Sequence, residues 1–220
     1  MNASELIAVV VASYLIGSIP FGYLTGRILR GIDIREQGSG STGATNALRL
    51  LGRGPFFMVM ALDALKGYVP VLAVWYLFGA HDLQVAAGIA VVLGHDFPIY
   101  IGFRGGRGTA SSFGVCAAFA LPLAVGLLAV GLFLLFTLRY MSVMSIVTVP
   151  LGAILLLLLA VFNVSDDFTY TKAIFGAFAT AFVLLTHAGN IQRLIDGVEP
   201  KFDEAVDSLR QRKRPRPRTT

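Results

Sequence analysis

Charged residues and cysteine are both scarce in this 220-residue sequence. Charged side chains make up 14% of the chain and hydrophobic ones 55%, and the mean hydropathy is +0.73. This composition excludes an ordinary soluble domain and is typical of a protein with several membrane-spanning segments. The single cysteine, Cys116, excludes an internal disulfide, and its apolar neighbours indicate simple packing.

The residue sets of many catalytic centres are also missing. No pair of carboxylates is placed for acid–base chemistry, and no set of His, Cys and Asp has metal-ligand spacing, so we expect neither a metal nor another cofactor. Tyr100 and Gln192 stand five residues after His95 and His187, where a His-x4-Asp centre would need aspartate. The loop that begins at Gly102 lacks the Gly-Lys pair of a Walker sequence. We therefore expect a site that positions its substrates and stabilises their charge, without a protein nucleophile.

Basic residues outnumber acidic ones by 18 to 13, but they cluster in short loops and in the tail. Membrane orientation explains this distribution, because cytoplasmic loops are rich in Lys and Arg, so we expect no nucleic-acid partner. The first apolar run follows Glu5 instead of a basic segment, and no cleavage pattern follows it. This run is therefore expected to be a retained helix and not a signal peptide.

Long apolar runs without alternation predict an all-α, polytopic integral membrane protein and exclude a closed barrel. One transmembrane domain is expected over residues 1–202, followed by a basic, Pro/Arg-rich, disordered cytoplasmic tail at 203–220. The predicted membrane helices number seven: 6–29, 55–78, 83–101, two short crossings within 109–138, 141–162 and about 168–186.

Residues 109–138 could instead form one long span, which would leave six crossings. Two short crossings that turn near Pro122 place Arg139 and the tail on the same side as the other loop arginines, whereas one crossing separates them. We therefore predict two crossings, with the N-terminus outside and the C-terminus in the cytoplasm.

Two membrane helices contain unusual polar features. Pro20, flanked by Gly and Ser, predicts a kink in the first helix, which is tolerated only where neighbouring groups bind the freed carbonyl. Asp63 and Lys66 stand three residues apart on one helix face, so each lowers the cost of burying the other. This pair is interpreted either as functional or as a structural ion pair.

The most informative segment is residues 38–46, Gly-Ser-Gly-Ser-Thr-Gly-Ala-Thr-Asn, followed by Arg49. Its three glycines and four hydroxyl residues allow a tight turn that points several N–H groups at one spot, and 44–51 predicts a short helix. A phosphate there would gain from the helix N-terminus and from the Arg49 guanidinium. We therefore predict an anion-binding loop with these residues; the alternative is a loop that is merely flexible.

Two further polar segments are expected at the same membrane face. Residues 102–109, Gly-Phe-Arg-Gly-Gly-Arg-Gly-Thr, repeat the combination of glycine and arginine. His187 and Asn190 stand three residues apart at the end of the last span, so they share one helix face. Two such loops beside a His/Asn pair predict a cytoplasmic site for two phosphate groups.

Taken together, these motifs resemble those of the bacterial membrane acyl-phosphate:glycerol-3-phosphate acyltransferase family. The similarity covers about residues 5–202 and is carried, in order, by 17–23 (Gly-Ser-Ile-Pro-Phe-Gly-Tyr), 38–46 with Arg49, 62–67 (Leu-Asp-Ala-Leu-Lys-Gly), 94–98 (Gly-His-Asp-Phe-Pro) with 103–108, and His187 with Asn190. The resemblance implies seven helices in the bacterial plasma (inner) membrane, an acyl phosphate donor and glycerol 3-phosphate as acceptor. The implied products are 1-acyl-glycerol 3-phosphate and phosphate, in the first acylation of phospholipid synthesis.

The resemblance also implies roles for individual residues. Catalytic roles fall on Ser39, Arg49, His187 and Asn190, and a structural one on Glu199. Substrate binding falls on Gly38, Gly40, Ser41, Gly43, Thr45, Asn46, Lys66, His95, Arg104, Gly105, Gly106, Arg107 and Gly108. The second glycine loop is expected to bind glycerol 3-phosphate by close backbone approach, because a Cβ there would displace the phosphate. The family usually has Lys at positions 104 and 107, and Arg differs from Lys in its hydrogen-bonding geometry.

Two other function classes fit parts of the sequence. A transporter of an organic phosphate would also use broken helices, but its polar groups would lie near the membrane midplane, in repeated halves that this chain lacks. A scaffold that docks soluble lipid enzymes through the basic tail is the third interpretation. An acyltransferase would have membrane lipid around it and the soluble enzyme that makes acyl phosphate as a transient partner.

Two groups could accept the proton of the glycerol hydroxyl. One is His187, acting as general base, and the other is a phosphate oxygen of the donor. We favour the donor phosphate, because it is anionic, lies at the reacting carbon and leaves with the proton.

Overall fold

The computed structural model describes residues 2–202 and 204, and every regular element in this part of the chain is helical. The elements are α1 Ala3–Gly17, α2 Phe21–Arg30, η1 Ile34–Glu36, α3 Ala44–Leu51, α4 Arg53–Phe78, α5 His81–Asp96, η2 Ile99–Ile101, α6 Thr109–Phe119, α7 Leu121–Leu138, α8 Met141–Val161, α9 Tyr170–Thr186 and α10 Ala188–Ile195. The tail predicted at 203–220 lies outside the described residues, except for residue 204.

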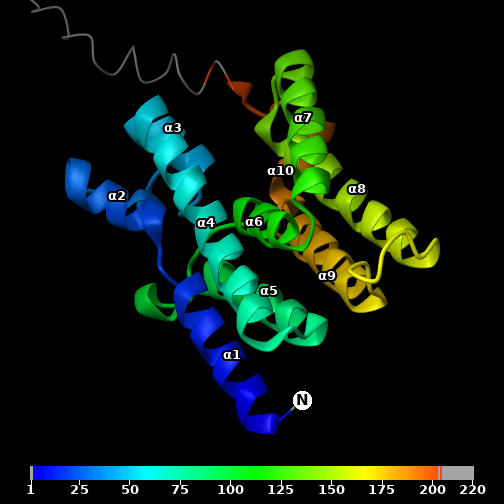
Figure 1. Ribbon diagram of the computed structural model, residues 1–220. Helices are drawn as coiled ribbons and strands as arrows, with labels where there is room; N and C mark the ends of the chain where they lie inside the picture. The colour runs from blue at the N-terminus through cyan, green and yellow to red at the C-terminus, as the bar shows by residue number, and fades with distance from the viewer. Residues whose placement is uncertain (1, 203, 205–220) are drawn as a thin grey trace, which may run out of the picture.

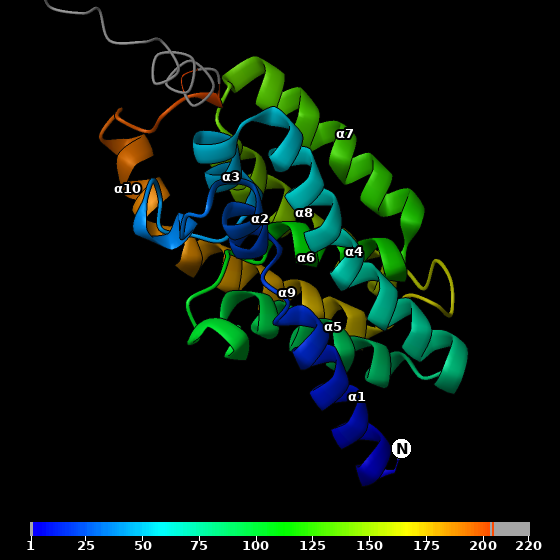
Figure 2. The same ribbon diagram turned by 90° about the vertical axis from the view of Figure 1, so that its left-hand side faces the viewer.

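The short helix α6 lies at the centre of the bundle, where it packs against α4, α5, α7, α8 and α9 (Figures 1 and 2). Its contact with α4 is unusually close, because a Cβ on Gly67 would overlap the backbone of Ser111 and one on Gly114 would overlap that of Ala64. Small residues allow such an approach between membrane helices. The close approach fixes α6 against α4 and thereby fixes the loop that precedes α6.

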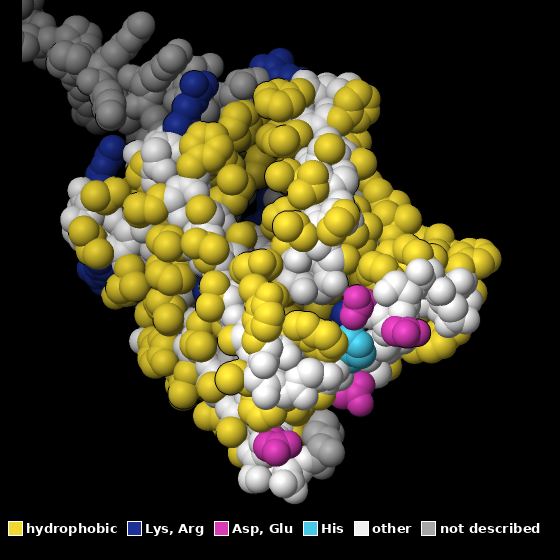
Figure 3. Space-filling view, viewed as in Figure 1, with side chains coloured by type: hydrophobic (Ala, Val, Ile, Leu, Met, Phe, Trp, Pro, Cys, Tyr) yellow, Lys and Arg dark blue, Asp and Glu magenta, His cyan; other side chains and the backbone are white. Residues whose placement is uncertain are grey.

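Five helical segments are long and apolar enough to cross a membrane: 3–30, α4, 81–101, α7 and α8. A sixth is added if α9 and α10, bent by 59°, are counted as one broken span. Helix α6 has only 11 residues, so at 1.5 Å per residue it is about 16 Å long, roughly half the thickness of the hydrocarbon layer. Apolar side chains cover most of the face seen in Figure 3, and many large hydrophobic residues of the described chain are exposed. The protein is an all-helical, multi-pass integral membrane protein.

The break predicted at Pro20 is present between α1 and α2. Lys66 Nζ donates a hydrogen bond to the carbonyl oxygen of Ile19 (2.8 Å) and lies 2.9 Å from Asp63 Oδ1. The neighbouring group that the kink requires is therefore Lys66, on α4. This contact gives the buried Asp63–Lys66 pair a structural role.

The connections between helices gather at two ends of the bundle. At one end, the Thr42 N–H donates to the Gly105 carbonyl (3.2 Å), Arg107 contacts Asn190, and the Phe202 N–H donates to the Arg139 carbonyl (2.7 Å). At the other end, Lys172 Nζ lies 5.9 Å from the Trp75 ring centroid and 5.4 Å from that of Phe119, next to the α6–α7 junction. The three polar segments singled out in the sequence thus meet at one end.

Candidate active site

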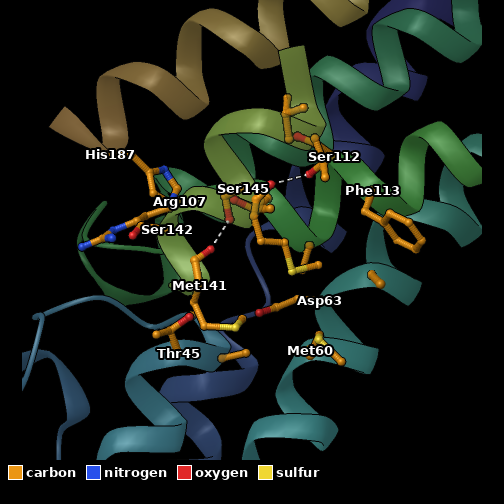
Figure 4. Close-up of a pocket in the computed structure, with 18 of the residues that line it drawn as sticks. Thr45, Met60, Asp63, Arg107, Ser112, Phe113, Met141, Ser142, Ser145 and His187 are labelled. Atoms are coloured by element: carbon orange, nitrogen blue, oxygen red, sulfur yellow. Dashed lines mark hydrogen bonds between the residues drawn. The ribbon is translucent and has the colours of Figure 1, made fainter. Parts of the chain in front are cut away.

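A cavity of about 380 Å³ lies among α3, α4, α6, α8, α9 and α10 (Figure 4). Ten of the predicted site residues line it: Ser39, Ser41, Gly43, Thr45, Asn46, Arg49, His95, Arg107, His187 and Asn190. Seven do not: Gly38, Gly40, Lys66, Arg104, Gly105, Gly106 and Gly108. We call residues 38–46 the first loop and residues 102–108 the second loop.

The first loop is folded around the side chain of Asn46. Its Nδ2 lies 2.7 Å from the carbonyl oxygen of Ile34 and 2.9 Å from that of Ser41, and its Oδ1 accepts the Ser39 N–H at 2.9 Å. Gly38 has a φ of +63°, and a Cβ there would overlap Asn46 Oδ1. Asn46 and Gly38 therefore shape the loop, and three of its four hydroxyl residues, Ser39, Ser41 and Thr45, line the cavity.

Arg49 follows the first loop on α3 and lines the same cavity. Its Nε is buried, and no described residue accepts a hydrogen bond from it. Burial lowers the pKa of the Arg49 guanidinium, while Glu199 acts to raise it. A buried cation without a full set of partners stabilises an anion bound beside it.

The second loop is fixed by the end of α5. The Gly105 N–H donates to the Asp96 carbonyl (3.1 Å) and the Gly106 N–H to the His95 carbonyl (3.0 Å). A Cβ on Gly105 would overlap the His95 carbonyl, and one on Gly106 would overlap the His95 ring. Both glycines are thus required for packing on α5, which is a different reason from the predicted approach to a phosphate.

Arg107 brings the second loop into the cavity, whereas Arg104 is exposed and points elsewhere. The Arg107 guanidinium donates to Asn190 Oδ1. Asn190 Nδ2 donates to Glu199 Oε1 (2.6 Å), and Arg193 Nε donates to Glu199 Oε2 (2.8 Å). This chain of hydrogen bonds fixes Asn190, and through it the direction of Arg107.

Burial and hydrogen bonds determine the pKa values of Glu199 and Arg107 in this hydrogen-bonded series. Burial acts to raise the pKa of the Glu199 carboxyl, but hydrogen bonds from Asn190 and Arg193 outweigh it and lower the pKa below its usual value. Glu199 is therefore an anion that holds its two neighbours. Burial, together with the nearby Arg193 and Arg49, lowers the pKa of Arg107. The cavity thus contains two partly desolvated guanidinium groups, those of Arg49 and Arg107.

His187 stands at the junction of α9 and α10, beside Arg107 and Ser142 (Figure 4). Its side chain is buried, and Nδ1 lies 2.9 Å from the carbonyl oxygen of Val183. Because a carbonyl can only accept, this contact places the hydrogen on Nδ1 and leaves Nε2 as the acceptor in the neutral ring. His187 can therefore bind a substrate hydroxyl through Nε2.

Several cavity residues were not among those predicted. They are hydroxyl residues on α6 and α8, together with Asp63: Thr109, Ser112, Ser142, Ser145, Thr148 and Asp63. The hydroxyl oxygen of Ser112 is buried without a hydrogen-bond partner in the described chain. Their spacing of three or four residues within apolar runs was the available signal, because hydroxyls repeated at that spacing share one helix face.

Comparisons with known proteins agree with this geometry. The family model described as glycerol-3-phosphate acyltransferase matches residues 7–197. A glycerol-3-phosphate acyltransferase of Nostoc sp. is 40% identical over 218 residues, covering 90% of this chain and 92% of the relative. One from Halalkalibacterium halodurans is 42% identical over 200 residues, covering 88% and 93% of the two chains.

Two crystal structures of PlsY, an integral membrane glycerol 3-phosphate acyltransferase, share the fold. The glycerol 3-phosphate form has a TM-score of 0.83 and 33% sequence identity, and the match covers 90% of this chain and 95% of that one. The lysophosphatidic acid form has a TM-score of 0.81 and 32% identity, with coverage of 92% and 98%. The resemblance found in the sequence motifs is confirmed: this chain belongs to the glycerol-3-phosphate acyltransferase family.

Proposed function

We propose that this acyltransferase takes its acyl group from an acyl phosphate and transfers it to the sn-1 hydroxyl of glycerol 3-phosphate. The observation that carries the proposal is the pair of partly buried guanidinium groups, Arg49 and Arg107, that face one cavity with an apolar extension. Two cations suit two phosphate groups, and the apolar extension suits an acyl chain. The products are 1-acyl-glycerol 3-phosphate, a lysophosphatidic acid, and inorganic phosphate.

The two substrates divide the polar end of the cavity between them. Ser39 and Arg49 bind the phosphate of the donor, next to the N-terminus of α3. Arg107, His187 and Asn190 bind glycerol 3-phosphate: Arg107 contacts its phosphate, and His187 Nε2 orients its hydroxyl. The shape of the loops depends on Asn46, Gly105 and Gly106. Lys66 stabilises the break between α1 and α2 by donating a hydrogen bond to the Ile19 carbonyl.

In the reaction, the sn-1 oxygen attacks the acyl carbon, and the bond from that carbon to the phosphate oxygen breaks. The hydroxyl proton passes to a phosphate oxygen of the donor, which leaves as inorganic phosphate. The carboxylates of the cavity support this route over a protein base, because Asp63 is paired with Lys66 and Glu199 with Arg193. No covalent acyl-enzyme is formed.

Substitutions of His187 test the proton route. His187→Gln and His187→Asn keep a hydrogen-bonding group without basicity, so we expect measurable turnover, whereas His187→Ala loses most of it. A protein base is indicated instead if both amide variants are as inactive as His187→Ala and kcat titrates with a single group that His187→Gln removes. Trapping of a labelled acyl group on Ser39 would exclude both routes.

The activity itself is tested with purified protein in detergent. Given acyl phosphate and glycerol 3-phosphate together, it should release inorganic phosphate and form 1-acyl-glycerol 3-phosphate in equal amounts. A transporter of an organic phosphate or a scaffold would form neither product. Arg49→Ala provides the matched inactive control, and Arg104→Ala the active one, because Arg104 is exposed outside the cavity.

The same proposal includes a seven-crossing topology in the bacterial plasma membrane, with the N-terminus outside and the site in the cytoplasm. It is supported by parity: the second loop and the α7–α8 junction meet at one end, whereas the α6–α7 junction lies beside Trp75 and Lys172 at the other. Helix α6 is then a crossing of 11 residues, which requires a locally thin membrane or support from its neighbours. In Figure 3, basic side chains lie toward the first end and acidic ones toward the second, as the positive-inside rule requires.

Cysteine labelling decides the topology. In a Cys116→Ser background, cysteines at Asp82 and Asp166 should react with a membrane-impermeant reagent from outside, and one at Asp196 only after permeabilisation. Labelling of the Asp196 position from outside would favour six crossings.

A further inference from the structure

The cavity continues from its polar end into the membrane-embedded part of the bundle. Along α8 its lining repeats every three or four residues, from Ser142 through Ser145 and Gly152 to Leu156, so one face of this helix forms one wall. The surface is hollowed between α4 and α7, with basic side chains visible inside (Figure 3). This apolar extension is long and narrow.

The extension ends at two large buried side chains. Leu156 on α8 and Phe175 on α9 are each only 2% exposed, and no residue beyond them on either helix, toward its outer end, lines the cavity. The Phe175 ring lies edge-on to Phe119, with centroids 5.3 Å apart. The floor is therefore supported from behind by packed side chains and does not open further.

The wall above this floor is made of small residues. Gly152 and Ala153 on α8 face Gly176 and Ala179 on α9, and a Cβ on Gly176 would approach the Ala153 Cβ to 2.9 Å. A larger residue at position 176 would collide with Ala153 on α8, and one at position 152 would collide with Leu127 on α7. The small residues therefore let α7, α8 and α9 pack closely beside the extension.

The length of the extension suits one long acyl chain. Fourteen helical residues separate Ser142 from Leu156, which corresponds to about 21 Å at 1.5 Å per residue. An extended hydrocarbon advances about 1.3 Å per methylene, so about 16 carbons fill the distance from the polar end to the floor.

From this geometry we propose that Leu156 and Phe175 are specificity-determining residues that set the longest acyl chain the enzyme accepts. The inference rests on the acyl phosphate donor proposed above. Up to the floor, each methylene moves from one apolar environment to another, so the rate changes little with chain length. Beyond the floor, extra methylenes have to displace packed side chains, which is costly.

The test is a profile of kcat/KM over acyl phosphates with an even number of carbons, at saturating glycerol 3-phosphate. The wild-type profile should be nearly flat up to about 16 carbons and then fall roughly tenfold for each further pair. We call the chain length at which kcat/KM begins to fall the edge of the profile. Leu156→Ala should move this edge to longer chains by about two carbons, and Leu156→Phe should move it to shorter ones. Phe175→Leu replaces a large buried side chain with a smaller one, so it should also lengthen the longest accepted acyl chain. The test therefore does not depend on Leu156→Phe, which could overpack the core.

Leu157→Phe is the matched control, because Leu157 stands next in sequence but is 46% exposed on the outer face of α8. The edge of the kcat/KM profile of Leu157→Phe should stay at the wild-type chain length. The proposal is overturned if the profile has no edge, or if the edge stays in place in Leu156→Ala, Leu156→Phe and Phe175→Leu. If no acyl phosphate of any length gives products with wild-type protein, the donor assignment has failed instead.

Discussion

The two glycine-rich loops look alike in sequence but use their glycines differently. In the first loop, Gly38 and Gly40 have positive φ values, and the turn they form surrounds the Asn46 side chain. In the second loop, Gly102 and Gly108 also have positive φ values, but Gly105 and Gly106 do not; these two are required because His95 and its backbone lie where a Cβ would be. The first loop thus offers hydroxyls to the cavity, whereas the second offers a single arginine.

This difference shows that glycine alone does not identify a ligand contact. A glycine can supply a left-handed conformation, or it can let another part of the protein approach closely. Only the second use explains Gly105 and Gly106, and there the neighbour is the protein itself. The four predictions below test how each loop is held and what it brings to the cavity, from the largest expected effect to the smallest.

Loss of Asn46 should have the largest effect. Asn46→Ala leaves the buried Ile34 carbonyl without its partner, at about 1–3 kcal/mol, and also removes the partner of the partly buried Ser41 carbonyl and Ser39 N–H. We expect a clearly lower Tm and a fall of at least about 100-fold in kcat/KM, because the first loop loses its shape. Gln37→Ala, which removes an exposed amide in the same region, is the control and should leave both values near wild type. Normal activity of Asn46→Ala would show that the loop is held by other contacts.

Alanine in the second loop should act through His95. Gly106→Ala places a Cβ on the His95 ring, so we expect a lower Tm and a reduced kcat/KM, with overpacking of about 1–3 kcal/mol. Adding His95→Ala removes that ring, so the double variant should be no worse than His95→Ala alone. Gly105→Ala meets backbone and should not be rescued in this way. A higher KM for glycerol 3-phosphate, with unchanged Tm and no rescue, would instead support direct phosphate contact by Gly106.

Substitution of Arg107, which lines the cavity, should affect substrate binding more than substitution of Arg104, which does not. Arg107→Lys replaces a planar fork in the cavity with a point charge and weakens the bond to Asn190, so KM for glycerol 3-phosphate should rise about tenfold. Arg104→Lys should leave KM within about twofold, because Arg104 is exposed. Equal effects of the two substitutions would contradict the placement of Arg107 alone in the site.

The smallest effect should come from the Asp33–Arg35 ion pair, which connects the segment before the first loop to the segment before the second loop. Arg35 donates to the Ile101 carbonyl (2.6 Å), just before the second loop, and Asp33 holds Arg35 through paired hydrogen bonds. The hydrogen bond from Arg35 lowers the pKa of Asp33 to about 2, from an ordinary value of 3.8. Because the folded pKa is depressed, this stabilisation is fully present above about pH 4 and is lost as the pH falls through about 2.

Asp33→Asn should therefore lower Tm by a few degrees from pH 8 down to pH 5, with a constant difference from wild type. The difference should shrink as the pH falls below 4. Glu36→Gln, an exposed carboxyl nearby, should show no such difference. If the Tm difference between Asp33→Asn and wild type already disappears between pH 7 and pH 5, the stabilisation comes from another group.

Much of the local structure could be predicted from the sequence, because its signals depend on neighbouring residues. The break at Pro20 and the short helix over 44–51 follow from glycine, proline and apolar periodicity, whereas the interruption near residue 120 was predicted from the distribution of arginines. Composition likewise determined the all-helical membrane class. The grouping of the three polar segments followed from the positions of the arginines between apolar runs.

The partners of individual side chains were decided only by the tertiary structure. Lys66 closes the α1–α2 break, Asn46 fills the first loop and His95 blocks the space above Gly106, and each of these contacts joins residues or backbone groups whose pairing no local pattern specifies. The hydroxyls of Ser112 and Ser142 were missed for the same reason, since they enter the site only when α6 and α8 pack together. Local signals set where helices begin and end, but which polar atoms meet depends on how those helices pack through space.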